Sequence, residues 1–64
     1  MCLSTVYEET AGERRKVCEY VSGVSTEGET VTMTDIMGVK TVVRGSIRSL
    51  DLVNNVIVIE GITQ

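Results

Sequence analysis

The stretch TEGETVTMTDI, residues 26–36, decides the fold class of this chain. Its first four residues predict a turn, because Gly28 can adopt a positive φ angle. In the residues that follow, Val31 and Met33 alternate with three threonines. This period of two is typical of a half-buried β-strand, with Val31 and Met33 facing the core. The stretch therefore predicts a hairpin.

The rest of the sequence repeats this pattern of short apolar segments separated by turn residues. Valine, isoleucine and threonine are frequent, and proline is absent. Besides residues 30–36, we expect strands at residues 2–8, 14–24, 39–44, 46–53 and 56–59. The pattern predicts an all-β fold, a small barrel-like or SH3/Sm-like antiparallel sheet of about six strands. We expect residues 1–64 to form a single small β domain.

The apolar residues of each segment also predict which face is buried and where the strand ends. In the first strand, the inward face is expected to hold Leu3, Thr5 and Tyr7, and the outward face Cys2, Ser4 and Val6. The alternation in residues 14–24 breaks midway, which predicts a bulge or a bend. Gly45 is expected to end the strand before it. Residues 46–53 could form a helical turn, but we favour a strand because the pair Asn54 and Asn55 suits a two-residue type I′ turn.

The last predicted strand is apolar on both faces, since Val56 and Val58 alternate with Ile57 and Ile59. Only one face can meet the core of so thin a domain, so the other face needs a cover. A second copy of the chain in a two-fold dimer is the simplest cover. A part of the same chain folded over this face is the alternative. We therefore expect a homodimer.

Composition argues against several classes of partner. The net charge is −3 and only two residues are aromatic, so the chain has little to neutralise phosphates or stack on bases, and we expect no nucleic-acid partner. The basic residues 14–16 follow glutamates, which favours solvated charge over an anion site. No apolar run approaches the roughly 20 residues that span a bilayer, so no membrane partner is expected. With two cysteines and no signal peptide, a cytoplasmic location is expected.

Catalysis is the least favoured class of function. The chain has no histidine to generate a thiolate from either cysteine. Its nine carboxylates are spread over loops and outward strand positions, whereas acid/base chemistry needs two of them in one cleft. We therefore expect no enzymatic activity and no catalytic residue.

The two cysteines have different surroundings in the sequence. Cys18 lies among apolar strand residues and is expected to be a small buried hydrophobe, with a metal ligand or a redox partner of Cys2 as alternatives. The Met1 amine, the Cys2 amide nitrogen and the Cys2 thiolate lie within a few bonds and can form chelate rings. Nitrogen and sulfur donors in one plane suit nickel(II) or copper(II). Two chains could complete four-coordination if their first strands begin beside a dimer axis; an incidental cysteine is the alternative.

Three segments, MCLSTVYEE at 1–9, STEGE at 25–29 and GSIRSLDLVNNVIVIEG at 45–61, resemble the CooT family. These are small nickel-binding accessory proteins associated with maturation of carbon monoxide dehydrogenase. The resemblance implies a small β-barrel-like subunit, a homodimer, and nickel held through the cysteine at position 2, which is Cys2 here. The role of Met1 is inferred from chelate geometry alone. Cys18 matches no motif of the family.

The sequence and the resemblance together predict a cytoplasmic, homodimeric metallochaperone for nickel. Ni(II) would be held at the dimer interface by the Cys2 thiolates and N-terminal backbone nitrogens, and delivered to carbon monoxide dehydrogenase. One alternative is a small dimeric β-barrel that serves as a protein-interaction module without metal. Another is a redox sensor that uses Cys2 and Cys18.

Overall fold

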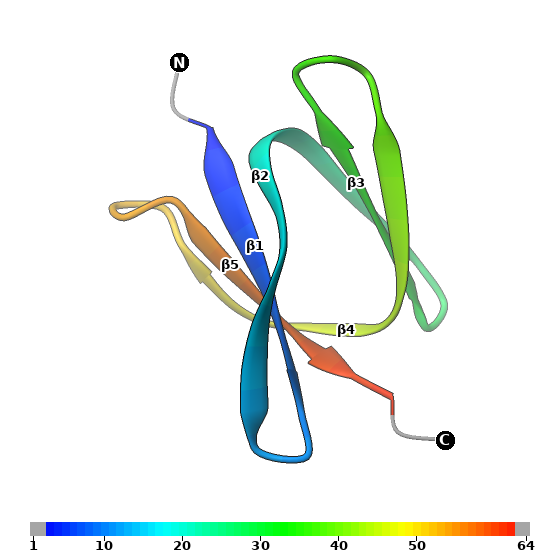
Figure 1. The fold of residues 1–64 in the computed structure, drawn as a ribbon. Helices are drawn as coiled ribbons and strands as arrows, with labels where there is room; N and C mark the ends of the chain where they lie inside the picture. The colour runs from blue at the N-terminus through cyan, green and yellow to red at the C-terminus, as the bar shows by residue number, and fades with distance from the viewer. Residues whose placement is uncertain (1–2, 63–64) are drawn as a thin grey trace.

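The structure, a computed structural model that describes residues 3–62, is a closed barrel of five strands. The strands are β1 (Ser4–Thr10), β2 (Glu13–Glu27), β3 (Thr30–Asp35), β4 (Lys40–Asp51) and β5 (Val56–Gly61). They follow one another around the barrel in chain order (Figure 1). Successive strands pair antiparallel, and β1 pairs parallel with β5 to close the ring. The predicted all-β, barrel-like fold is confirmed.

The ring has five strands rather than about six because β4 continues through Gly45. Up to Arg44, β4 pairs with β3, and from Gly45 onward it pairs with β5. A Cβ atom at Gly45 would lie 2.4 Å from the carbonyl oxygen of Glu60, so only glycine fits this close approach. Gly45 thus forms a barrel corner, and the prediction that it ends a strand was wrong. Residues 46–51 are extended, as predicted, and not helical.

The predicted irregularity in the second strand is confirmed. Val6 pairs with Cys18 and Tyr7 with Lys16, so β2 carries one extra residue between these two pairs. A second shift follows at Val21, where β2 leaves β1 and begins to pair with β3. Such bulges increase the local bend of a strand. They allow one 15-residue strand to serve two neighbours on a strongly curved sheet.

The core consists of apolar side chains from four strands, namely Val6, Val21, Val31, Met33, Ile57 and Ile59. Val31 and Met33 face inward, as predicted. The prediction for the first strand was wrong, because Val6 is fully buried and Tyr7 is only half-buried. The compact β-branched side chain fills the narrow interior. The tyrosine ring remains at the surface, where the Arg14 guanidinium lies 5.8 Å from its centroid.

Both faces of β5 are covered within a single chain. Ile57 and Ile59 join the core, and Val58, which points the other way, is only 4% exposed. In the sheet, Val58 is flanked by Tyr7 of β1 and Ser49 of β4. The chain's own side chains therefore cover this strand, as in the predicted alternative to a partner subunit. The second face of β5 gives no reason to invoke a dimer.

Of the two predicted two-residue hairpin turns, one is confirmed and the other is not. Glu27 pairs with Thr30 across a two-residue turn, and Gly28 has a φ of 58°, as predicted. The predicted two-residue turn at Asn54 and Asn55 was wrong. Asp51 pairs with Val56, which leaves the four-residue loop 52–55.

Candidate functional site

The start of β1 lies between two loops at one end of the barrel. Ser4 pairs with Val21, which in turn pairs with Asp35, the last residue of β3. On the other side, Thr5 pairs with Val56, which pairs with Asp51, the last residue of β4. The β3–β4 loop, residues 36–39, and the β4–β5 loop, residues 52–55, therefore leave the barrel on either side of the first strand (Figure 1).

The β3–β4 loop holds apolar side chains out toward solvent. Ile36, Met37 and Val39 are 57%, 81% and 59% exposed. The Asp35 carboxylate accepts hydrogen bonds from the amides of Met37 and Val39 at 2.9 and 3.0 Å. The Ile36 amide also donates to the Tyr20 carbonyl at 3.1 Å, which joins this loop to the bend of β2. The side chain of Tyr20 is itself exposed, so the bend of β2 adds a large apolar side chain beside this loop.

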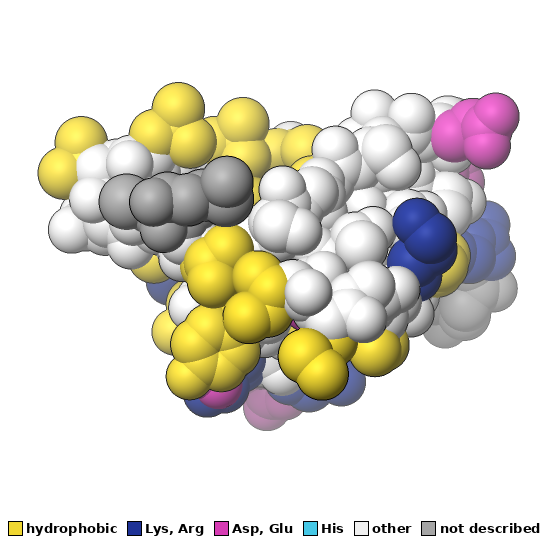
Figure 2. All heavy atoms as spheres, turned by 90° about the horizontal axis from the view of Figure 1, so that it is seen from above, with side chains coloured by type: hydrophobic (Ala, Val, Ile, Leu, Met, Phe, Trp, Pro, Cys, Tyr) yellow, Lys and Arg dark blue, Asp and Glu magenta, His cyan; other side chains and the backbone are white. Residues whose placement is uncertain are grey.

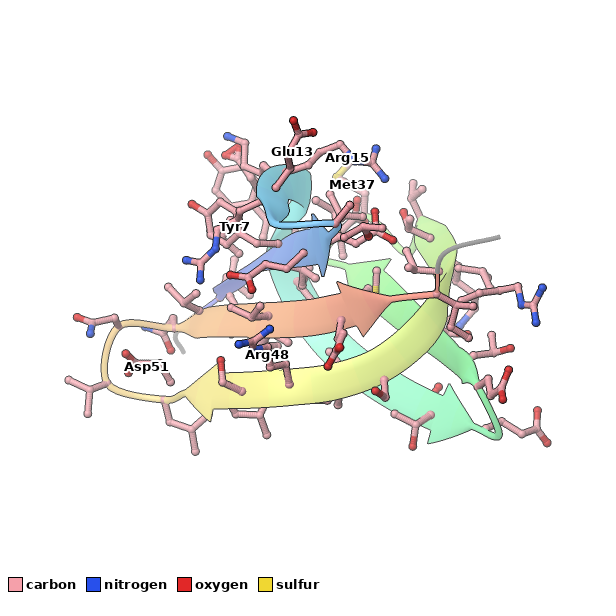
Figure 3. The ribbon with its side chains drawn as sticks, turned by 90° about the horizontal axis from the view of Figure 1, so that it is seen from below. Tyr7, Glu13, Arg15, Met37, Arg48 and Asp51 are labelled. Carbon is pink, nitrogen blue, oxygen red and sulfur yellow. The ribbon has the colours of Figure 1, made fainter. Side chains whose placement is uncertain are left out.

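The β4–β5 loop is built in the same way. Leu52 and Val53 are 78% and 88% exposed. Asp51 lies at the end of β4, next to this loop (Figure 3). Its carboxylate accepts hydrogen bonds from the Val53 amide at 3.1 Å and from both the backbone amide and the side-chain amide of Asn54 at 2.9 Å. These bonds hold the pKa of Asp51 below its usual value. A charged carboxylate thus fixes a loop whose apolar side chains contact water.

We call this the apolar end of the barrel. It comprises the start of β1 and the exposed side chains of Tyr20, Ile36, Met37, Val39, Leu50, Leu52 and Val53. Outside it, the exposed large hydrophobic residues of the described chain are Val42 and Ile62. Figure 2, which looks down on this end, shows hydrophobic side chains gathered in two groups. Exposed groups of large apolar side chains on a small protein are candidate interaction surfaces.

The predicted metal ligands, Met1 and Cys2, lie outside the described residues. The described chain begins at Leu3, directly before β1 and at the apolar end. Residues 3–62 contain no group of three or more acidic, cysteine or histidine side chains that could hold a metal ion, and they enclose no pocket. In the same residues, no helix is long and apolar enough to cross a membrane.

Cys18 is a free thiol that packs against the core, as predicted, but it is half-buried rather than fully buried. Burial, and to a lesser degree the negative charge of Asp35, raise the pKa of Cys18 above its usual value. A raised thiol pKa leaves less of the nucleophilic thiolate at neutral pH. Cys18 pairs with Val6, whereas Ser4, which is closer to the N-terminus, pairs with Val21 and not with Cys18. These features do not favour a redox partnership with the N-terminal cysteine.

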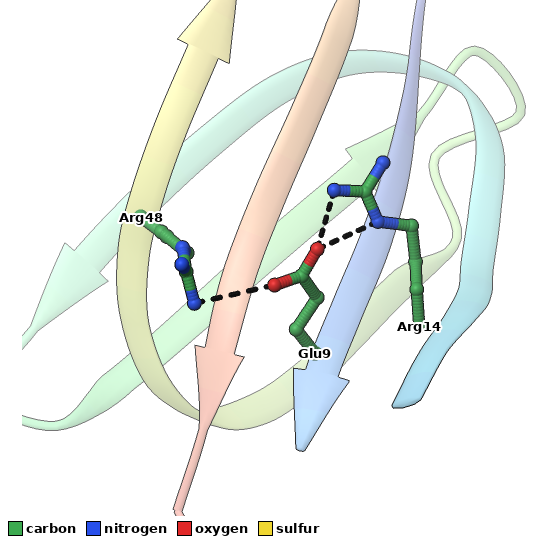
Figure 4. Close-up of polar contacts among 3 residues, drawn as sticks. All are labelled: Glu9, Arg14 and Arg48. Carbon is green, nitrogen blue, oxygen red and sulfur yellow. Dashed lines mark hydrogen bonds and ion pairs between the residues drawn. The ribbon is translucent and has the colours of Figure 1, made fainter. Parts of the chain in front are cut away.

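The basic residues 14–16 are paired with glutamates, as the charge pattern predicted. Arg14 bonds to Glu9 and Arg15 to Glu8, while Lys16 and Glu19 are 3.1 Å apart. Glu9 also contacts Arg48 at 3.2 Å, so this carboxylate links β1 to β2 on one side and reaches across β5 to β4 on the other (Figure 4). The cluster is a set of surface ion pairs and leaves no unpaired basic patch for an anion.

Sequence reasoning missed the apolar end. The signal for it is present in the segments DIMGV at 35–39 and DLVN at 51–54, where aspartate precedes large apolar residues in a turn. Aspartate commonly bonds to the amide two residues later and so stabilises a turn. Because the following residues sit in a turn, their apolar side chains cannot reach the core.

The described residues form a small closed β-barrel with exposed hydrophobic side chains around the start of its first strand. The family model described as CO dehydrogenase accessory protein CooT matches residues 1–60. The chain therefore belongs to the CooT family. It is an accessory protein of CO dehydrogenase and not itself an enzyme.

The fold has a counterpart among solved structures. A crystal structure of a protein from Carboxydothermus hydrogenoformans, assigned as a CooT, has a TM-score of 0.84 and is 21% identical in sequence. The match covers 97% of this chain and 100% of that chain. At this identity, the similarity establishes the fold. The search of curated proteins found no match.

Proposed function

We propose that this CooT protein carries nickel(II) to CO dehydrogenase, with one ion bound between two copies of the chain. The ligands in this proposal are the Cys2 thiolates and N-terminal backbone nitrogens, among them the amine of Met1. The observation that carries the proposal is the apolar end, because the first strand begins there between two loops that expose large hydrophobic side chains.

A dimer through the apolar end would meet two requirements at once. It would remove the exposed side chains of Met37, Leu52 and Val53 from water, which is favourable at about 25 cal/mol per Å² of apolar area. It would also bring two N-termini near one axis, so that each chain contributes a thiolate and a nitrogen to a single ion. Planar coordination by nitrogen and sulfur suits nickel(II).

The proposed chemistry fits a carrier better than a permanent cofactor site. Ligands at a chain terminus are held by few contacts, so an ion bound there can be exchanged. The thiolate and the amine must lose protons before they bind a metal, so affinity should fall as the pH is lowered. The carrier would act in the cytoplasm, where thiols stay reduced.

Calorimetric titration of the reduced protein with nickel(II) tests this function. We expect half an equivalent of nickel per chain, a thiolate-to-nickel charge-transfer band, and loss of both in Cys2→Ser. The matched control is Cys18→Ser, which removes the other thiol and should retain binding. Unchanged nickel binding in Cys2→Ser would refute the proposed ligand set.

A protein-interaction module without metal is the second candidate, and the exposed hydrophobic side chains of the apolar end favour it. In that case Cys2 has no role. A Cys2→Ser variant that binds no nickel yet activates CO dehydrogenase as well as wild type would favour the module over the carrier.

A further inference from the structure

Between positions 3 and 62, the residues that carry sulfur are Cys18, Met33 and Met37. They differ in their access to solvent. Met33 lies in the core and is 1% exposed, whereas Met37 is 81% exposed. Cys18 is half-buried, and its raised pKa leaves little of the reactive thiolate. Met37 therefore carries the sulfur atom that a dissolved oxidant can reach most easily in this part of the chain.

The turn that carries Met37 is fixed by three backbone contacts with Asp35. The Met37 amide donates to the Asp35 carboxylate at 2.9 Å, and the Gly38 amide donates to the Asp35 carbonyl at 2.9 Å. The Asp35 amide in turn donates to the Val39 carbonyl at 3.0 Å. Gly38 has a φ of 84°, which glycine adopts without strain. These contacts fix the backbone of Met37 outside the core, so its thioether remains accessible.

The exposed side chains next to Met37 in this loop are hydrocarbons. Ile36 and Val39 are 57% and 59% exposed, and neither offers an atom that a peroxide can readily oxidise. Oxidation of methionine converts an apolar thioether into a polar sulfoxide and disrupts interfaces that contain it. A single oxygen atom on Met37 would thus place a hydrogen-bond acceptor within the apolar end of the barrel.

We propose that Met37 is a site of reversible oxidation by hydrogen peroxide, and that its sulfoxide weakens the association of two chains through the apolar end. The sulfur lone pair attacks one peroxide oxygen, and the S–O bond forms as the O–O bond breaks. The transferred oxygen gives its proton to the departing hydroxide, which leaves as water. Sulfur is oxidised by two electrons, and the peroxide is reduced. The reaction takes place on the single chain, in which Met37 is exposed. The effect on association rests on the proposed function, whereas the oxidation site does not.

The test treats reduced wild type and Met37→Leu with hydrogen peroxide and then with dithiothreitol, which reduces disulfides and sulfenic acids but not methionine sulfoxide. Met37→Leu is the matched control, because it keeps the apolar surface, Met33 and both cysteines. Peptide mapping by mass spectrometry should find sulfoxide at Met37 in wild type while Met33 is still unmodified.

Two further measurements follow the surface itself. On a hydrophobic-interaction column, which reports on apolar surface without any partner, treated wild type should elute earlier than untreated, and treated Met37→Leu should show no such shift. Methionine sulfoxide reductases of both stereospecificities should reverse the shift. In sedimentation over a range of concentrations, we expect about tenfold weaker self-association of treated wild type, because a buried oxygen without a hydrogen-bond donor opposes association.

Each outcome decides one part of the inference. Equal oxidation of Met33 and Met37, or an unchanged retention time of treated wild type, would overturn Met37 as the site. Unchanged self-association of the oxidised protein would overturn the effect on the dimer. Wild type that is monomeric before treatment would refute the proposed dimer, and the effect on association with it. Peptide mapping and retention would still decide the oxidation site, so the two failures are distinguishable.

Discussion

At the scale of single residues, the two faces of the sheet differ sharply in what a substitution should cost. Ile59 is fully buried in the core, whereas Val42 is 61% exposed on the outer face. We expect Ile59→Ala to lower the free energy of unfolding by about 2–5 kcal/mol, because it removes buried methyl groups and leaves a cavity. Val42→Ala should change it by less than about 0.5 kcal/mol. Urea denaturation measures both; similar losses would contradict the assignment of faces.

Cys18 should be an unreactive thiol in the folded protein. Burial raises its pKa above the usual 9.0, so less thiolate is available at a given pH than in the unfolded chain. In a Cys2→Ser background, we expect iodoacetamide at pH 8 to alkylate Cys18 more slowly in the native protein than in urea. As the pH rises through the pKa of the thiol in the unfolded chain, the unfolded chain ionises first, so the free energy of unfolding falls. Equal alkylation rates would contradict this description.

At the scale of the elements, the corner in β4 depends on the absence of a side chain at Gly45. We expect Gly45→Ala to lower the free energy of unfolding by about 1–3 kcal/mol, because its Cβ would lie 2.4 Å from a backbone oxygen of β5. Gly23→Ala is the matched control, since it lies in β2 and the nearest atom to its Cβ would be 4.0 Å away. Thermal unfolding of both variants tests this, and equal losses would mean that the corner tolerates a side chain.

The Glu9 ion pairs connect three strands and should give the barrel an acid-sensitive contact. The hydrogen bond from Arg14 and the charges of Arg14 and Arg48 lower the pKa of Glu9 below 4.5. A lowered pKa stabilises the fold above the unfolded value, and this contribution is lost as the pH falls through the folded value.

Glu9→Gln should therefore flatten the decline of the free energy of unfolding below about pH 4.5. Glu13→Gln is the control, because Glu13 forms no ion pair with the residues that the structure describes. Urea denaturation as a function of pH measures the difference. If both variants follow the wild-type curve, the Glu9 contacts do not contribute in solution.

At the scale of the whole molecule, the sequence was a good guide to the class of fold and a poorer guide to its surface. The alternation of Val31 and Met33, the turn at Gly28 and the irregular second strand are local signals, and all three were predicted correctly. The corner at Gly45 could not be predicted, because it depends on how close β5 approaches. The inward position of Val6 likewise depends on the bulge opposite it.

The candidate site could also be predicted only in part from the sequence. The prediction that Met1 and Cys2 are ligands depends only on the order of atoms along the chain, and the sequence specifies that order completely. The apolar end depends on which strands are neighbours in the barrel. Val21 pairs with both Ser4 and Asp35, and Val56 pairs with both Thr5 and Asp51, so these pairings bring the two loops to the start of β1. Closure of the barrel therefore creates the surface, and no local pattern specifies it. The proposed dimer therefore uses this end of the barrel and not the outer face of β5.

The most direct test of the central claim is native mass spectrometry of the reduced protein after addition of nickel(II). The account predicts a dimer that carries one nickel ion, and loss of the ion in Cys2→Ser. A monomer that carries nickel, or a dimer that carries none, would contradict it.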